Sequence, residues 1–570
     1  MFKRKNLLKN EFFPSELPPC FTTAILADHE HAAIEAANEF KKDCSIPLII
    51  SGFKSESARR RLALPNPYHY CRAIDYVVSH EEEIKSILQK SKYSLTAPVN
   101  RNPKETEPYA KKTPTIADTK REIEKQFQDN RYEIRLDISS FFDSIYTHSI
   151  PWAIYGIEEA KRNKKDKMLW GNQLDERMEA LNYKQTNGIL IGNALSRIIS
   201  EIILCSVDEE IQKRLPELVC RRFVDDYYIY TKDSSQVKEI IAVVRNALAK
   251  YQLYFNESKI AINESPFIYG KPWLDQTRLY LYLSADVYLS RLITEYEKYK
   301  DISIFKYGLK VLSVCKFSHE DWPVVQSRLI NVWVRFPSLA DRILPIFWKN
   351  IDRLNKRMLK KAIYGIIDES ILLKHSQELI WAVWYVKLFD IIISQSYALK
   401  VLQSENDIAI VIMLDILTKQ NMLDVEAIKK QRREIRHMLE ETNDPNSEQK
   451  NELMWSSHWL LAYEAERRKW LKFPGSPFEL VKKNSFFKRL IEEGVYFYDD
   501  NYIYDPPNKE VAGKYSVVSY ADLNKALNRL KKMLISHVEC GQQPQEKLEA
   551  EDRLFEEFVY ALENDEKLYW

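Results

Sequence analysis

The sequence predicts two kinds of structure in succession, an α+β domain over about residues 1–290 and an all-α domain over about residues 291–570. The first part alternates segments rich in β-branched and aromatic residues, such as YEIRLDI (132–138), with segments of helical periodicity. The second part is a series of Leu-, Ile- and Trp-rich helical patterns separated by short polar gaps. Such a series predicts a helical-repeat domain, with an irregular helical domain as the alternative.

Composition sets the limits of this prediction. A chain of 570 residues is too long for a single core, and its 45% hydrophobic and 29% charged residues are ordinary for a folded protein. Only 12 residues are glycine, which favours long helices over turn-dense β architecture. The 84 Lys and Arg nearly balance the 82 Asp and Glu, so the net charge gives no indication of a phosphate-bearing partner.

Several classes of protein are disfavoured. The seven cysteines form no Cys-x-x-Cys pair, which argues against a zinc ribbon or a disulfide framework and suits a reducing cytoplasm. No segment approaches the ~20 apolar residues of a membrane span, and the basic start lacks the apolar stretch of a signal peptide. The ten histidines show no metal-ligand spacing, and we find no Ser-His-Asp pattern or P-loop. We therefore expect a soluble, cytoplasmic protein without a membrane partner.

Three aspartates carry the clearest chemical signal. RLDISSFFDSIY (135–146) leads from a strand-like segment through Asp137, and RRFVDDYYIY (221–230) sets Asp225 and Asp226 between apolar and aromatic runs. Neighbouring carboxylates repel unless a cation neutralises them, and Mg²⁺ prefers oxygen ligands. Each segment alone is typical of a surface turn. Together they predict a two-metal site, which can activate a 3′-hydroxyl and stabilise leaving pyrophosphate.

A glycine-containing segment lies between the two aspartate segments. In QTNGILIGNALSRIISEIILC (185–205), Gly188 and Gly192 precede a long helical pattern. Glycine permits close approach of the backbone to a ligand at the start of a helix. Such glycine-containing helix starts are common, and this one is informative about a ligand site because it lies between the two aspartate segments.

The order of these segments resembles a known family. LDISSFF, TNGILIGNALS, FVDD and FNESK resemble motifs A to D of reverse transcriptases. The resemblance implies a fingers–palm polymerase domain. It also implies Asp137 and Asp225 as the principal metal ligands, Asp226 as the supporting carboxylate, and Mg²⁺, or Mn²⁺ in its place, as the cofactor.

The same resemblance assigns residues to the nucleotide. Phe142 matches the bulky gate that excludes a ribose 2′-hydroxyl, which implies dNTP substrates, and Lys259 resembles the motif D lysine that contacts phosphate or donates a proton. Asn187 and Gly188 lie in motif B, which lines the nascent base pair. Templated reverse transcriptases carry Gln-Gly and Ser-Pro where this chain has Asn187-Gly188 and Gly192-Asn193. This departure argues against ordinary templated copying.

A closer resemblance is to the abortive-infection reverse transcriptases, the anti-phage group that includes the AbiK and Abi-P2 types. It rests on YTHSIPW (146–152), GNALSRIISE (192–201) and ARRRLALPNPYHY (58–70). That group implies a HEAT-like helical-repeat domain after the polymerase and DNA synthesis without a conventional template. It also implies priming from a protein hydroxyl, a single-stranded DNA product attached to the protein, and a homo-oligomer.

The arginines of the upstream segment have two interpretations. Guanidinium groups suit triphosphate oxygens, and in this context we assign Arg59 and Arg60 to the incoming dNTP. A solvated basic face before a helix is the alternative.

Two other functions of the chain also stay open: a conventional reverse transcriptase templated by a bound RNA, and a catalytically idle polymerase fold that binds nucleic acid as a scaffold.

Two further patterns receive structural interpretations. GVYFYDDNYIYDPP (494–507) contains a Tyr-Asp-Asp, but it lacks a partner aspartate strand upstream. We expect an aromatic-rich surface hairpin or an interface segment there. The basic segments KRNKKDK (161–167) and KKQRREIRH (429–437) are expected to be solvated helical faces, with phosphate contact as the alternative.

Overall fold

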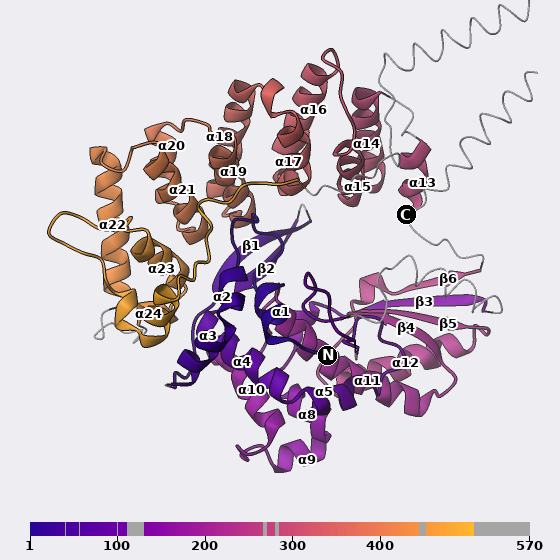
Figure 1. Ribbon diagram of the computed structural model, residues 1–570. Coiled ribbons are helices and arrows are strands. Elements are labelled where there is room, and N and C mark those ends of the chain that lie inside the picture. Colours follow the sequence, from indigo (N-terminus) through magenta and orange to yellow (C-terminus); the bar gives the residue numbers. More distant parts are fainter. Residues whose placement is uncertain are drawn as a thin grey trace, which may run out of the picture. The chain divides into compact units, whose positions relative to one another are not determined.

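The computed structural model describes eight stretches of the chain (Figure 1): residues 1–39, 41–55, 57–99, 101–110, 130–265, 271–279, 284–443 and 452–506. The described residues group into two compact units. The first unit draws on the described residues of Met1–Tyr269, Ser370–Lys387 and Ile392–Tyr502, and the second on those of Gly270–Glu369 and Leu388–Ile391 together with residues 503–506. The domain boundary expected near residue 290 stays a prediction.

A four-stranded antiparallel sheet forms one part of the first unit. Its strands are β3 (Tyr132–Asp137), β4 (Val219–Phe223), β5 (Asp226–Thr231) and β6 (Ala261–Glu264), in the order β4-β5-β3-β6. Their aromatic and β-branched residues suit a pleated, half-buried surface. The register pairs Tyr132 with Thr231 and Asp137 with Asp226, so the last residue of β3 faces the first residue of β5.

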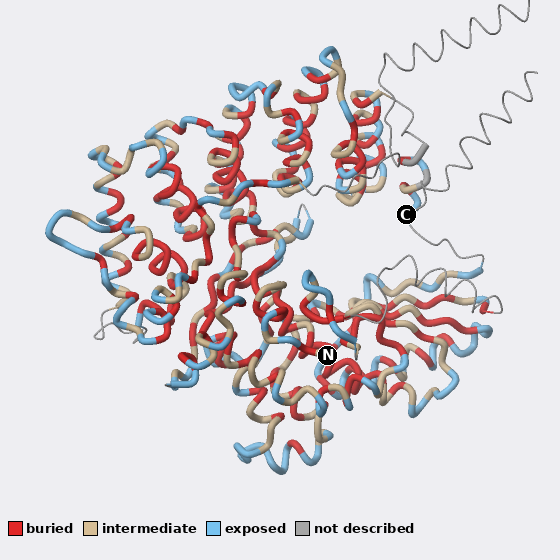
Figure 2. Tube along the Cα trace, viewed as in Figure 1, coloured by how far each residue is buried: buried red, intermediate tan, exposed pale blue. Residues whose placement is uncertain are grey.

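Helices pack beside the sheet (Figure 1). The longest is α11 (Ala194–Arg214), which contacts α5 (Glu81–Leu88), α8 (Ser149–Tyr155) and α12 (Gln236–Ala249). Apart from Arg197, the residues of α11 from Ala194 to Asp208 are buried, and Figure 2 shows the buried interior that they share with the sheet. The glycine-containing segment therefore leads into a long helix, as the sequence predicts.

A second, two-stranded sheet lies upstream of α4 (Pro67–Ser79). It consists of β1 (Leu48–Ser55) and β2 (Ala58–Leu64), which pair antiparallel. Leu62 forms a parallel bridge with Ile191, and the amide of Ala63 donates to the carbonyl of Ile191 at 3.0 Å. This contact brings the arginine-bearing strand β2 to the segment that precedes α11.

The remaining described elements are helical. The first unit also contains α1 (Arg4–Lys9), α2 (Ala24–Asp28), α3 (Glu30–Asn38), α10 (Trp170–Leu181), α19 (Ser376–Leu388), α20 (Gln395–Leu402), α21 (Asp407–Lys419), α22 (Glu426–Thr442), α23 (Trp459–Arg467) and α24 (Ser485–Glu492). The second unit contains α13 (Pro272–Leu279), α14 (Ala285–Tyr299), α15 (Ser303–Leu312), α16 (Trp322–Arg335), α17 (Ala340–Lys349) and most of α18 (Lys356–Leu372). The mixture of helix and sheet agrees with the predicted α+β class, whereas the HEAT-like repeat stays a prediction. No helix within the described stretches combines the length and apolarity that a bilayer crossing requires.

Tyr498 and Asp500 of the Tyr-Asp-Asp segment are buried and Asp499 is half-buried, so the prediction of a surface hairpin is wrong, whereas the alternative of an interface segment stays a prediction. Tyr498 is fully buried, its hydroxyl donates to Asp415 at 2.9 Å, and it accepts from Lys387 Nζ at 2.8 Å. Asp500 is also buried and pairs with Arg468. This segment is part of the core of the first unit because these charged partners satisfy its polar groups.

A buried ion network lies between α11 and the β4–β5 hairpin. The guanidinium of Arg222 contacts Glu201 at 3.0 Å and Asp208 at 2.9 Å, and all three side chains are at most 2% exposed. The hydroxyls of Ser94 and Thr96 donate to the two oxygens of Glu201 at 2.9 and 2.6 Å. Because every charge has a partner, the network is tolerated, and removing one member leaves uncompensated buried charge.

Replacement of Arg222 by leucine should therefore destabilise the first unit by roughly 3–5 kcal/mol, seen as a lower urea midpoint. Arg131→Leu, which removes an exposed ion pair to Glu264, is the matched control and should cost at most ~1 kcal/mol. Equal losses in the two variants would contradict the assigned role of the network.

Candidate active site

Asp137 is fixed by backbone contacts on both sides of its strand. It ends β3 opposite Asp226, and its carbonyl accepts from the amide of Asn256 at 2.8 Å. Two residues later, the amide of Ser139 donates to the carbonyl of Tyr254 at 2.8 Å. The carboxylate therefore leaves the sheet at a defined position, beside β5 on one side and the 254–259 segment on the other.

The turn between β4 and β5 carries Asp225 and leads directly into Asp226, the first residue of β5. The first residue of the turn, Val224, has φ +55°, a conformation that β-branched residues rarely adopt. Two side chains hold it there: Thr96 Oγ1 accepts from the Val224 amide at 3.1 Å, and Arg222 Nη1 donates to the Val224 carbonyl at 2.8 Å. The buried ion network thus supports the strained turn that presents the two aspartates.

The three carboxylates concentrate negative charge. Burial raises the pKa of Asp226 to about 6, and the charges of Asp225 and Asp137 add to this rise. Burial also raises the pKa of Asp225; Asp137 reinforces the rise, while Lys259 and Arg60 oppose it. Lys259 Nζ donates to Asp137 Oδ2 at 3.0 Å from the 3₁₀ turn η1 (Glu257–Lys259), and its side chain is 55% exposed.

These residues fit divalent cations. Carboxylate oxygens from two neighbouring strands are the ligands that Mg²⁺ prefers. Burial is the main cause of the raised pKa values of Asp225 and Asp226, and the neighbouring carboxylates add to the rise; Lys259 opposes it at both residues and Arg60 opposes it at Asp225. Asp137, Asp225 and Asp226 are therefore the residues that would hold such ions.

A second pair of segments brings together Phe142, Asn187 and Gly188. The Ile189 amide donates to the Phe142 carbonyl at 2.9 Å, and the Gly188 amide donates to the Ile145 carbonyl at 2.8 Å. Gly188 has φ +82°, and a Cβ there would lie 3.1 Å from the Asp143 carbonyl oxygen. Glycine is therefore required by both conformation and space. The side chain of Asn187 is exposed beside this junction.

Asn193, one of the two departures from the family pattern, has a structural explanation. Its side chain accepts from the Ser196 amide at 2.9 Å as the N-cap of α11, and it donates to the Leu190 carbonyl at 2.9 Å. Asparagine is among the preferred helix N-caps. Asn187, the other asparagine that departs from the family pattern, has an exposed side chain instead.

The two assigned arginines lie in different surroundings. The Arg59 guanidinium binds both oxygens of the buried Glu378 carboxylate at 2.7 and 2.6 Å, and it also bonds Ser51. Its side chain is thus engaged with α19 rather than with the aspartates. Arg60 is exposed and lies close enough to Asp225 to lower the pKa of that carboxyl.

Sequence reasoning did not identify the residues that support the turn. Thr96 is 128 positions from Val224, so no local pattern connects them. Arg222 occupies a buried strand position at which an apolar residue is expected. A charged residue at such a position is the sequence feature that could have identified it.

Comparison with known proteins gives one family match. Residues 60–277 match the family model described as reverse transcriptase (RNA-dependent DNA polymerase), which is less than half of the chain. No curated protein sequence matches the chain.

Solved structures of telomerases resemble the chain at low similarity. The apo telomerase of Candida tropicalis has a TM-score of 0.28 and 13% identity, with 80% of this chain and 69% of that chain covered. A form truncated from the C-terminal domain has a TM-score of 0.28 and 13% identity, with 40% and 51% covered. The Candida albicans telomerase in complex with a fragment of telomeric RNA has a TM-score of 0.27 and 11% identity, with 65% of each chain covered. The chain thus spans 51% of the truncated structure and 65% of the Candida albicans one.

The pKa of Asp226 makes stability depend on pH when no divalent ion is bound. The folded-state pKa of about 6 lies above the ordinary 3.8, so the stability contributed by the proton is present below about pH 4 and lost as the pH rises through 6. Asp226→Asn removes the charge. Above pH 7 it should raise the free energy of unfolding of the metal-free protein by about 1 kcal/mol or less after solvent screening, and the thermal midpoint should rise with it. Near pH 4 it should have little effect.

Thermal melts at the two pH values, in the presence of a chelator, measure this difference. Asp424→Asn, at a side chain that is 97% exposed, is the control and should show no pH-dependent gain. A gain of the same size at both pH values would contradict the prediction.

Proposed function

Because the chain contains a reverse transcriptase domain within residues 60–277, we propose that it is a DNA polymerase that transfers nucleotidyl groups from dNTPs. The observation that carries the proposal is the pairing of Asp137 with Asp226 at the ends of β3 and β5, with Asp225 in the adjoining turn. Two Mg²⁺ ions, or Mn²⁺ in their place, would activate the attacking hydroxyl and stabilise the leaving group when bound.

The protein side chains then have separate roles. The aspartates would hold the ions that orient the reacting groups, and Lys259, which lies beside Asp137, would contact phosphate or give a proton to the leaving group. In the reaction, a hydroxyl oxygen bonds to the α-phosphorus and its proton passes to solvent water. The bond from that phosphorus to the bridging oxygen breaks, and pyrophosphate leaves. Arg60 is assigned to the triphosphate, and Phe142 to exclusion of a ribose 2′-hydroxyl.

The synthesis in this proposal uses no conventional template and is primed by a protein hydroxyl. The support is the exposed Asn187 in place of the family glutamine, together with the resemblance of 146–152 and 192–201 to the abortive-infection group. Asn193 adds no support because its side chain caps α11. The product would then be single-stranded DNA attached to the protein.

The biological role in this proposal is abortive-infection defence against phage, carried out by a homo-oligomer. It rests on the same resemblance, which extends to the long helical part of the chain. The helices from α14 onward, arranged as a HEAT-like repeat, would support the oligomer and contact the product strand. Each of these assignments can fail without affecting the polymerase chemistry.

Replacing Asp225 and Asp226 together by alanine tests the polymerase. Purified, nuclease-treated protein is incubated with Mg²⁺ and each labelled dNTP, and products are separated on a denaturing gel. Loss of the ion-holding carboxylates should lower incorporation by at least ~10³-fold, since several kcal/mol of transition-state stabilisation depend on them. Circular dichroism checks that the variant is folded. Incorporation by a folded double variant at the wild-type rate would refute the assignment.

The same gel separates the modes of synthesis. Label that migrates with the protein until protease is added, in reactions without template or primer, supports protein-primed, untemplated synthesis. Label that appears only after RNA is restored supports the RNA-templated alternative and removes the finer part of the proposal. Failure of wild-type protein to bind Mg²⁺ or any dNTP would favour the scaffold alternative.

A further inference from the structure

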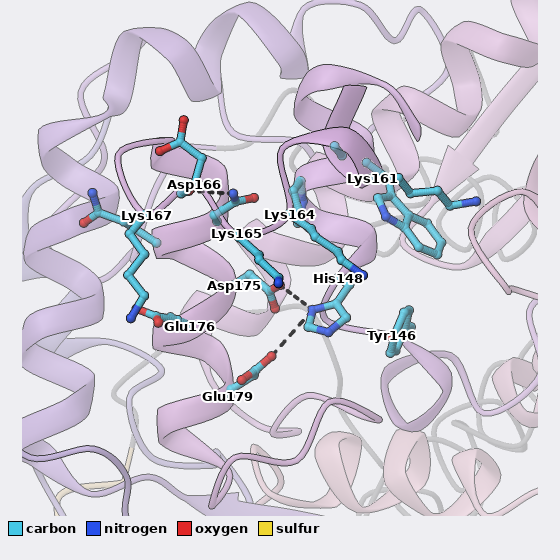
Figure 3. A pocket seen from close by; sticks show the side chains of 15 residues that line it. Tyr146, His148, Lys161, Lys164, Lys165, Asp166, Lys167, Asp175, Glu176 and Glu179 are labelled. Carbon is cyan, nitrogen blue, oxygen red and sulfur yellow. Dashed lines mark hydrogen bonds and ion pairs between the residues drawn. The ribbon is translucent and has the colours of Figure 1, made fainter. Parts of the chain in front are cut away.

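A cavity of about 530 Å³ lies in the first unit at residues to which the polymerase proposal gives no chemical role (Figure 3). It is lined by α10, by the residues around the start of α8, and by lysines of the 161–167 segment. His148, Asp175 and Glu179 point toward one another within it, as the dashed lines in Figure 3 show.

The three side chains have the geometry of a ligand set. His148 Nδ1 lies 2.6 Å from Asp175 Oδ2 and 3.6 Å from Glu179 Oε1. One ligand atom from each residue lies within 4.8 Å of the other two. Asp175 and Glu179 are four residues apart on α10, so they share one face of that helix. One imidazole nitrogen and two carboxylate oxygens suit a divalent transition ion such as Zn²⁺.

The environment of Asp175 is incomplete without a further ligand. Its side chain is buried, and among the residues that the structure describes its Oδ1 atom meets no hydrogen-bond partner. A buried, unpartnered carboxylate oxygen costs ~1–3 kcal/mol or more. The proton on His148 Nδ1 satisfies Oδ2 alone. A cation held by the three residues would neutralise both carboxylates.

The lysines of the cavity do not offer an equivalent site for an anion. Lys161, Lys164, Lys165 and Lys167 line the cavity, but all four are exposed, so solvent screens their charges. Asp175, by contrast, is buried in contact with His148. The buried group that lacks a partner is thus the Asp175 carboxylate, which suits a cation rather than an anion.

We propose that His148, Asp175 and Glu179 form a binding site for a divalent transition ion. Zn²⁺ is the ion with which we would test this site. This site shares no residue with the aspartates of β3 and β5. The bound ion ties α10 to the segment that pairs with motif B: Thr147 donates its amide to the Thr186 carbonyl at 2.8 Å, and Tyr146 bridges Asn187. His148 is accordingly a positioning residue for the segment that carries Asn187, rather than a catalytic one.

Zn²⁺ titration of the chelator-stripped full chain tests the site, followed by calorimetry and by metal analysis after desalting. Wild-type protein should bind one more equivalent than His148→Gln or Glu179→Gln, or bind it at least ~100-fold more tightly. Glu176→Gln is the matched control, because Glu176 is an exposed carboxylate of the same helix and cavity. It should bind as wild type does.

Two further measurements separate this site from the catalytic one. The Asp225/Asp226 double alanine should keep the equivalent that His148→Gln loses, and Zn²⁺ should raise the thermal midpoint of that double variant but not of the triple variant that also carries His148→Gln. Identical stoichiometry and affinity in wild type and Glu179→Gln would overturn the proposal, even if His148→Gln proved misfolded. Stabilisation by inorganic phosphate with no effect of Zn²⁺ would identify an anion site instead and would also overturn it.

Discussion

The repulsion between Asp137 and Asp226, paired across the β3–β5 ladder, is the constraint on which the rest of the site depends. Asp225 in the adjoining turn adds to it, and burial raises the pKa of both Asp225 and Asp226. A cluster of half-buried carboxylates lowers the stability of the fold unless a cation compensates for the charge. Lys259 compensates for part of this charge, and its exposed side chain can leave Asp137 without a large desolvation cost.

The cluster persists because a second network, in which the charged groups are paired or hydrogen-bonded, lies behind it. Arg222 pairs with two buried carboxylates of α11, which also accept hydrogen bonds from hydroxyl groups, and it donates to the carbonyl of Val224, whose backbone is in the left-handed region. Thr96 joins the two functions, since its hydroxyl donates to Glu201 and accepts from the Val224 amide. Thus the residues that stabilise the interior also fix the direction in which the turn presents its aspartates.

Local patterns in the sequence were sufficient for the strands, for α11, and for the order of the aspartate and glycine segments, because each depends on residues a few positions apart. Contacts between distant residues were not predictable in this way. Arg59 is engaged with Glu378, 319 positions away, although its sequence context suggested a phosphate ligand. Burial of Tyr498 depends on partners from two other helices. The cluster around His148 needs α8 and α10 to pack before any ligand spacing exists.

The most direct test of the account is electron paramagnetic resonance of the full chain with Mn²⁺ and a non-hydrolysable dNTP analogue. A two-metal centre held by Asp137, Asp225 and Asp226 predicts an exchange-coupled pair of Mn²⁺ ions roughly 4 Å apart. That signal should be lost in Asp137→Asn, while isolated Mn²⁺ at the His148 cluster would give an uncoupled spectrum. A wild-type spectrum that contains only uncoupled or free Mn²⁺ would contradict the assignment of a two-metal polymerase site to these aspartates.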